Sequence, residues 1–166
     1  MQLSGFSQRN TLLFGAVLVA LAVAAVFLFD TDTASKVSPN LANYDTKKVV
    51  VGEEKLVVFV ADTDKKRERG LSGVPGLESG EGMLFVFDSP DRYGIWMKEM
   101  LIPIDVLWFD EGGKLVHMVE NMRPESYPQA FTPPLPAKTI LEVHAGFIGR
   151  SNSKIIGQTE IKILSE

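Results

Sequence analysis

The residues with the most chemical potential lie together in the stretch GIWMKEMLIPIDVLWFD, which begins at Gly94. If this stretch is extended, alternation places the side chains of Trp96 and Lys98 on one face and that of Met97 on the other. An indole ring beside an ammonium group could line a pocket for a small anionic or extended ligand. The alternative interpretation is that Trp96 and Met97 fill the core while Lys98 carries its charge out to water.

Asp105 is the least expected side chain of this stretch. It alternates with Leu107 and Phe109, and the opposite face of the same segment is also apolar, so its carboxylate must lie among apolar groups. An ionised carboxylate is costly there unless it is paired with a cation or accepts backbone N–H bonds. Lys98 is one candidate partner, and a structural Asp105 would instead tie down the preceding turn through the backbone. A functional Asp105 could bind ligand, or act with Glu99 as the carboxylate pair of a hydrolase.

A second chemical possibility involves methionine and histidine. Thioether and imidazole groups suit Cu(I), and the candidate ligands are Met97, Met100, His117 and Met118, provided that the segments carrying them pair in a sheet. Methionine is also an adaptable core filler, and the sequence favours this interpretation. We therefore expect no cofactor.

Several enzyme signatures are absent from the sequence. There is no cysteine in the 166 residues, which excludes disulfides, thiolate metal sites and cysteine nucleophiles. The chain also lacks the G-x-S-x-G, H-E-x-x-H, P-loop and G-x-G-x-x-G patterns, and its two histidines give little material for a Ser-His-Asp assembly. A binding or accessory module is therefore expected rather than an enzyme.

The first part of the chain is not ordinary globular sequence. No charged residue occurs over the 19 positions from Thr11 to Phe29, and a helix of that length spans about the ~30 Å of hydrocarbon in a bilayer. The run is longer than the roughly 7–15 apolar residues of a secretory signal peptide, and no small-x-small cleavage site follows it. We expect an uncleaved transmembrane anchor over residues 11–29, with a signal peptide as the alternative.

The anchor sets the expected organisation of the chain. Residues 1–10 would form a cytoplasmic tail, residues 30–46 a polar linker, and residues 47–166 one domain on the extracytoplasmic side, periplasmic or extracellular. All 21 acidic side chains but only 16 of the 17 basic ones follow residue 29, a net charge of about −5. This charge argues against a nucleic-acid partner. The expected partners are the membrane, through residues 11–29, and a small ligand or protein.

The domain is expected to be α+β, mainly β. Valine-rich and alternating segments predict about eight short strands, among them KKVVVG, KLVVFVA, MLFVF, IDVLWF, KLVHMVE, TILEVHAG and EIKIL. A tight connection is expected between the first two, and the turn DEGG predicts a hairpin of IDVLWF and KLVHMVE. DTDKKRERGL has an N-cap Asp or Thr and a stop glycine and predicts a short helix, and AGFIGR could begin a second. In TILEVHAG, Leu141 and Val143 would face one way and Glu142 and His144 the other. This content favours a small, partly closed β-barrel that follows the N-terminal transmembrane helix.

The segment from Asn121 to Lys138 has five prolines and no apolar period, which makes it long for a structureless connection. Such loops often serve as lids or partner surfaces. In the alternative interpretation, Tyr127 and Phe131 pack across one end of the barrel. Tyr127 completes the candidate ligand-binding residues, which are Trp96, Lys98, Asp105, Met97 and Tyr127.

Four motifs run through the domain: ERGLSG from Glu68, EGMLFVF from Glu81, YGIWMKEMLIPIDVLWFD from Tyr93 and LEVHAGF from Leu141. In order and spacing they resemble the family called domain of unknown function 192. The similarity covers nearly all of the domain, from about residue 47 to residue 164. It implies a compact, β-rich and often exported domain, and it implies no activity, because the family's biochemical role is unassigned.

The chain departs from the pattern of that family at three positions. Family members commonly carry Asn or Asp where this chain has Glu99, and Asn where it has His144. A basic residue usually follows the GLSG stretch, and here that residue is Val74. If the basic residue belongs to a binding site, this chain has lost or replaced it.

Overall fold

The computed structural model describes residues 41–151 and 159–164. The expected cytoplasmic tail and the expected anchor at residues 11–29 lie outside the described residues. No helix within the described ranges is long and apolar enough to cross a membrane. Leu41 and Tyr44, which fall in the expected linker, pack against the core of the domain, so the folded unit begins before residue 47.

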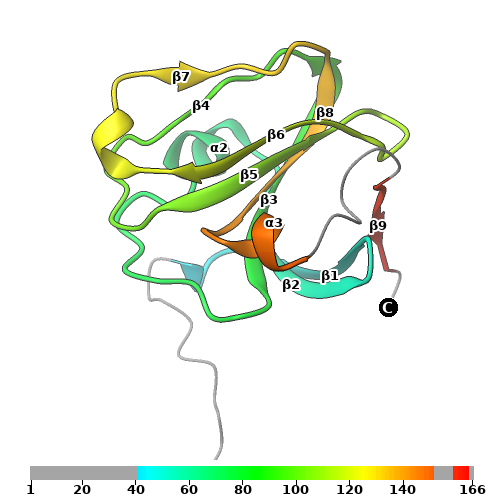
Figure 1. Cartoon of the computed structure of the whole chain (residues 1–166), viewed down its shortest axis with the longest axis horizontal. Helices are drawn as coiled ribbons and strands as arrows, with labels where there is room; N and C mark the ends of the chain where they lie inside the picture. Colours follow the sequence, from blue (N-terminus) through cyan, green and yellow to red (C-terminus); the bar gives the residue numbers. More distant parts are fainter. Residues whose placement is uncertain (1–40, 152–158, 165–166) are drawn as a thin grey trace, which may run out of the picture. The chain divides into compact units, whose positions relative to one another are not determined.

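One curled seven-stranded sheet forms the body of the domain (Figure 1). All neighbouring strands are antiparallel except β2 and β3, which are parallel. In spatial order the strands are β6 (Leu115–Met122), β5 (Ile104–Phe109), β8 (Ala137–His144), β3 (Glu81–Asp91), β2 (Glu54–Ala61), β1 (Thr46–Val51) and β9 (Ile161–Ile163). The predicted strands and the predicted β1–β2 and β5–β6 hairpins are confirmed.

The parallel pair of β2 and β3 requires a crossover connection, and α2 (Asp64–Arg69) lies in it. The Thr63 side chain caps the helix by accepting a hydrogen bond from the backbone N–H of Lys66, and Gly70, at φ 51°, ends it. The predicted cap and stop are therefore confirmed. The second predicted helix is α3 (Phe147–Arg150).

The proline-rich segment is not structureless throughout. It contains the 3-10 helix η2 (Pro124–Ser126) and the short strand β7 (Ala130–Phe131). β7 pairs with β4 (Ile95–Trp96) in a second sheet of two strands. The segment therefore places the stretch around Trp96 beside the main sheet.

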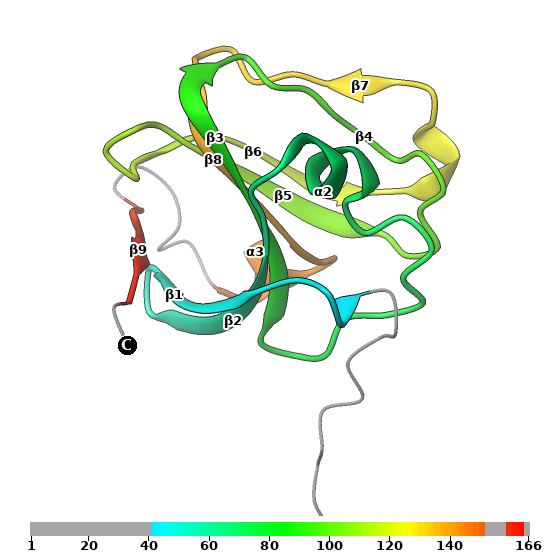
Figure 2. The ribbon, with the colours of Figure 1, turned by 180° about the vertical axis from the view of Figure 1, so that it is seen from behind.

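Both faces of the central strands are covered, and α2 and α3 lie on opposite sides of the main sheet (Figures 1 and 2). The face under α3 carries a core cluster that includes Leu107 and Leu141, here called the α3-side core. The other face carries a cluster that includes Val106 and Met83, here called the α2-side core, over which the β4–β7 ribbon packs. Every residue of β5 is buried as a result.

The N-terminal end of β9 approaches the β5–β6 turn, and this contact curls the sheet into a half-barrel. The backbone N–H of Leu115 donates to the carbonyl of Thr159 at 2.8 Å, and that of Ile161 donates to the carbonyl of Gly113 at 2.8 Å. A bridge between Lys114 and Glu160 lies between these two bonds. The partly closed barrel is confirmed in this form.

Gly113 is expected to be irreplaceable at this contact. Its φ is +81°, and an added Cβ would lie 2.8 Å from the carbonyl oxygen of Ile161. Gly113→Ala should therefore lower the free energy of unfolding by about 2 kcal/mol, measured by urea denaturation. Gly112→Ala is the matched control, because its Cβ would approach only the side-chain oxygen of Asp110, at 3.3 Å. Equal stability of the two variants would contradict this account of the closure.

Candidate ligand-binding site

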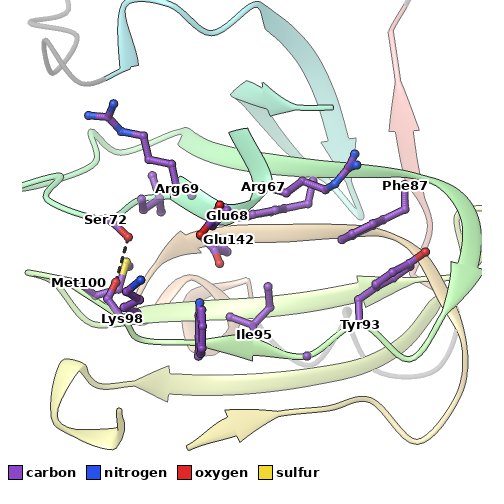
Figure 3. Close-up of a pocket in the computed structure, with 15 residues that line it drawn as sticks. Arg67, Glu68, Arg69, Ser72, Phe87, Tyr93, Ile95, Lys98, Met100 and Glu142 are labelled. Atoms are coloured by element: carbon purple, nitrogen blue, oxygen red, sulfur yellow. Dashed lines mark hydrogen bonds between the residues drawn. The ribbon is translucent and has the colours of Figure 1, made fainter. Parts of the chain in front are cut away.

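A pocket of about 250 Å³ opens on the α2 side of the sheet (Figure 3). All four of the motifs described above contribute to its lining: ERGLSG through residues 68–72, EGMLFVF through Phe85 and Phe87, YGIWMKEM through residues 93–96, 98 and 100, and LEVHAGF through Glu142. The strand order explains this convergence, since β3 and β8 are neighbours and both α2 and β4 cover the same face. Motifs far apart in sequence thus form one site.

Glu142 is the polar group buried at this pocket. Its neighbours in register on the two adjacent strands are Met83 and Val106, both fully buried and apolar. Its Oε2 atom has no hydrogen-bond partner within the described part of the chain. Because burial disfavours the ionised form, the pKa of Glu142 is raised from 4.5 to about 8. At neutral pH the pocket therefore contains a neutral carboxyl group that can donate a hydrogen bond.

Two hydrogen bonds join the loop after α2 to the turn after β4 at the edge of the pocket. The Ser72 hydroxyl donates to the carbonyl of Lys98 at 2.9 Å, as Figure 3 shows. The backbone N–H of Gly73 donates to the carbonyl of Glu99 at 2.9 Å. These bonds hold Lys98 at the pocket, where its ammonium lies 5.7 Å from the centre of the Trp96 ring.

Arg67 also lines the pocket but is held by the fold. Its guanidinium donates to the carbonyls of Asp62, at 2.8 Å, and Val86, at 2.7 Å. It also lies 5.0 Å from the centre of the Phe87 ring, which itself stacks on Tyr93. Arg67 is also ion-paired with Asp64, so it gives this wall of the pocket rigidity and little net charge.

The predicted ligand-binding residues have different positions. Trp96 and Lys98 line the pocket. Tyr127 meets Trp96 edge to face at 6.0 Å, and both rings are about half exposed (46% and 47%). Met97 is buried in the α2-side core. The expected alternation ends after Trp96 because the chain turns, with the N–H of Met100 donating to the carbonyl of Met97, so these two methionines share one core cluster.

Asp105 lies away from this pocket, with its side chain in the α3-side face of β5. Its Oδ1 accepts a hydrogen bond from the backbone N–H of Asn121 at 2.8 Å, and its Oδ2 accepts one from that of Ile148 at 2.9 Å. The predicted pairing with Lys98 is wrong, since Lys98 lies at the pocket on the other face. The structural interpretation is correct in that Asp105 accepts backbone N–H bonds, but these bonds tie β6 to α3 and do not hold the preceding turn.

The other candidate sets are not brought together. Glu99 lies in the turn after β4 and lines a shallow hollow next to the pocket, on the α2 side, away from Asp105. Met118 packs on the α3-side core, whereas Met97 and Met100 belong to the α2-side core. The ring of His117 lies 5.2 Å from that of Trp108. Within residues 41–151 and 159–164, no group of three or more His, Asp or Glu side chains could hold a metal ion.

Sequence reasoning missed Glu142. It assigned this residue to the polar side of β8 with His144, and the alternation itself is correct. The overlooked signal was in the neighbouring segments, because the strands beside β8 are apolar on both faces and leave it no solvent-exposed side.

A comparison with protein families agrees with this arrangement. The model of the family described as Uncharacterized ACR, domain of unknown function 192, matches residues 46–159. The chain belongs to this family.

The three positions that depart from its usual pattern have distinct surroundings. Glu99 has φ +56°, a conformation that suits Asn or Asp better, and Val74 is fully buried in the α2-side core. His144 Nδ1 lies 2.9 Å from the carbonyl of Ala145.

Solved structures share the fold of this family member. One is a protein of Sinorhizobium meliloti 1021 proposed to be a transcription regulator, with 25% identity and a TM-score of 0.68, covering 72% of this chain and 95% of its own. Another is a protein of unknown function from Novosphingobium aromaticivorans DSM 12444, with 21% identity and a TM-score of 0.66, covering 80% of this chain and 98% of its own. No curated protein matches the chain.

Proposed function

We propose that the domain is a binding module whose site for a small ligand is the Glu142 pocket. The observation that carries the proposal is the buried Oε2 atom of Glu142, which has no partner among the described residues although Glu142 is one of the residues that line an open pocket. Buried polar groups are normally paired, so a ligand that accepts its hydrogen bond would supply the missing partner. Aromatic and apolar walls around a few polar groups are typical of ligand sites.

The same proposal includes a location. We place the domain on the extracytoplasmic side of a membrane and attach it through residues 11–29, on the strength of their uncharged, apolar sequence. The acidic net charge of the remainder gives no electrostatic support to a nucleic-acid partner. A membrane-attached module of this kind would present its pocket to ligands outside the cytoplasm.

A second candidate function rests on the raised pKa of Glu142. A neutral carboxyl in a pocket can protonate a bound substrate, and shifted pKa values of this kind are frequent at catalytic sites. In this version the domain is an enzyme, and Glu142, in place of the Asp105 and Glu99 pair, is the proton donor. Turnover of a ligand found at the pocket, lost in Glu142→Gln, would favour the enzyme over the binding module.

Fluorine NMR of the full-length chain labelled with fluorotryptophan tests the binding proposal. The protein has two tryptophans: Trp96 lines the pocket, and Trp108 is fully buried. From a set of anionic, neutral and cationic fragments, we expect some to shift the Trp96 resonance and leave that of Trp108 in place. Trp96→Phe assigns the two signals. If no fragment of any charge shifts the Trp96 signal, the proposal is wrong.

A further inference from the structure

We infer that the ligand of this pocket is a small organic carboxylate, whose oxygen accepts the hydrogen bond of Glu142 and whose charge is balanced by Lys98. This inference rests on the binding role proposed above and adds the chemical class of the ligand. It follows from three properties of the pocket: its charge, the unpartnered Oε2 atom of Glu142 and its size.

The charge of the lining favours an anion. The charged and titratable groups that line the pocket with Glu142 are Arg67, Glu68 and Arg69 from α2, and Tyr93 and Lys98 from the β4 segment. With Glu142 neutral, the lining includes three cationic residues and one carboxylate. Arg67 is ion-paired with Asp64, and the Arg69 side chain points away from Glu142 and Lys98 (Figure 3), so Lys98 supplies positive charge at the pocket. A positively charged ligand would be repelled at this surface, and an anion would be attracted.

The unpartnered group selects among anions and neutral molecules by hydrogen bonding. The buried Oε2 atom of neutral Glu142 can provide an O–H donor, which needs an acceptor oxygen. A carboxylate oxygen accepts such a bond more strongly than a neutral carbonyl, because a hydrogen bond to an ionised acceptor is roughly twice as strong. The same carboxylate would gain from the ammonium of Lys98, a residue whose backbone carbonyl is held at the edge of the pocket by the Ser72 hydroxyl.

The volume and the apolar walls of the pocket determine which groups the ligand can carry besides its carboxylate. A volume of about 250 Å³ corresponds to roughly eight waters at ~30 Å³ each, so the pocket holds one ring or a short chain and not a drug-sized compound. Phe85, Phe87 and Trp96 provide apolar and aromatic surface for that part. A small aromatic acid such as benzoate therefore matches the pocket in size, charge and polarity.

A matched set of three probes tests the inference: benzoate, benzamide and benzylammonium, which share a ring and differ in charge. Each is titrated into the full-length chain while the Trp96 fluorine signal is followed. We expect benzoate to bind most tightly. If benzamide binds as tightly as benzoate, or benzylammonium more tightly, the inference is overturned while the binding role stands. If none of the three binds but other fragments shift Trp96, the inference fails alone. If no fragment binds, both fail.

Variants give a second and independent readout. Glu142→Leu removes the hydrogen-bond donor and should lower the affinity for benzoate by about tenfold or more. Lys98→Met should lower this affinity by roughly threefold. Lys55→Met makes the same charge change on an exposed residue outside the pocket and should have no effect. Unchanged benzoate affinity in both Glu142→Leu and Lys98→Met would overturn the inference.

The pH dependence of benzoate affinity distinguishes a Glu142 carboxyl that donates a hydrogen bond to the ligand from one that only contacts it. Benzoate is ionised throughout the range from pH 6 to 9. Its affinity should be constant at the low end and fall by up to about tenfold per pH unit above pH 8, where Glu142 loses its proton. Glu142→Gln keeps an N–H donor without an ionisable group, so it should bind benzoate with no such fall. A wild-type affinity that is flat up to pH 9 would contradict the inference.

Discussion

Asp105→Ala is expected to lower the free energy of unfolding by roughly 3–5 kcal/mol, the largest effect of any single substitution considered for this protein. The carboxylate is fully buried and accepts the backbone N–H groups of Asn121 and Ile148. Alanine would leave both donors unpaired. The N–H of Ile148 lies in the α3-side core, where an unpaired buried donor destabilises by about 1–3 kcal/mol, whereas the N–H of Asn121 is only partly buried. The substitution would also leave a cavity. Urea denaturation of the wild type and the variant measures the loss.

Two further variants make this prediction specific. Asp110→Ala is the matched control, because Asp110 also accepts a backbone N–H bond, from Lys114 at 2.9 Å, but at a partly exposed position. Its loss should be about 1 kcal/mol. Asp105→Asn retains one acceptor oxygen but turns an amide N–H₂ toward the second donor. Its loss of free energy of unfolding should therefore exceed that of Asp110→Ala and lie at or below that of Asp105→Ala. If Asp105→Ala lowers the free energy of unfolding no more than Asp110→Ala does, the hydrogen bonds of Asp105 to β6 and α3 do not stabilise the fold.

The second large effect is the contribution of Glu142 to the pH dependence of the free energy of unfolding. Its pKa is 4.5 in the unfolded chain and about 8 in the folded one. Between these values the folded state keeps a proton that the unfolded state has released, so the stability falls as the pH rises. For one group the slope is about 1.4 kcal/mol per pH unit. Below pH 4.5 both states are protonated, and above pH 8 both are ionised, so the effect is confined to this window.

Glu142→Gln isolates this effect from all other titrating groups. The variant is neutral at every pH, so its stability relative to the wild type should rise by roughly 3–4 kcal/mol from pH 5 to pH 8. Unfolding by urea at a series of pH values in that range provides the measurement. Glu120→Gln, at an exposed position on β6, is the control and should leave the difference constant. A constant difference for Glu142→Gln would mean that Glu142 is ionised in the folded protein.

The elements of the fold were predictable because their signals are local. Alternating apolar residues, the Thr63 cap, the Gly70 stop and the DEGG turn each specify a strand, a helix boundary or a hairpin within a few residues. The strand order was not predictable in the same way. It depends on which apolar faces meet, and β8 lies between β3 and β5 although it follows both in sequence.

The same limit explains the partial prediction of the site. Trp96 and Lys98 were found because their own segment is unusual in composition. Glu142 was not found, since its burial depends on Met83 and Val106, which come from two other strands. Asp105 was recognised as buried from its own strand, but its partners are backbone groups in β6 and α3 that no side-chain pattern marks. A site made by strand pairing is visible only once the pairing is known.

The central position of β8 has a consequence for the order in which this chain can fold during its synthesis. Residues 46–91 can form β1, β2 and β3 early, and residues 104–122 can form the β5–β6 hairpin, but no strand pairing joins these two parts until residues 137–144 are available. Until that time β3 and β5 each present an apolar, unpaired edge. A ribosome-bound or truncated chain that ends before β8 should therefore be prone to aggregation and dependent on chaperones, whereas addition of those eight residues joins the two parts of the sheet.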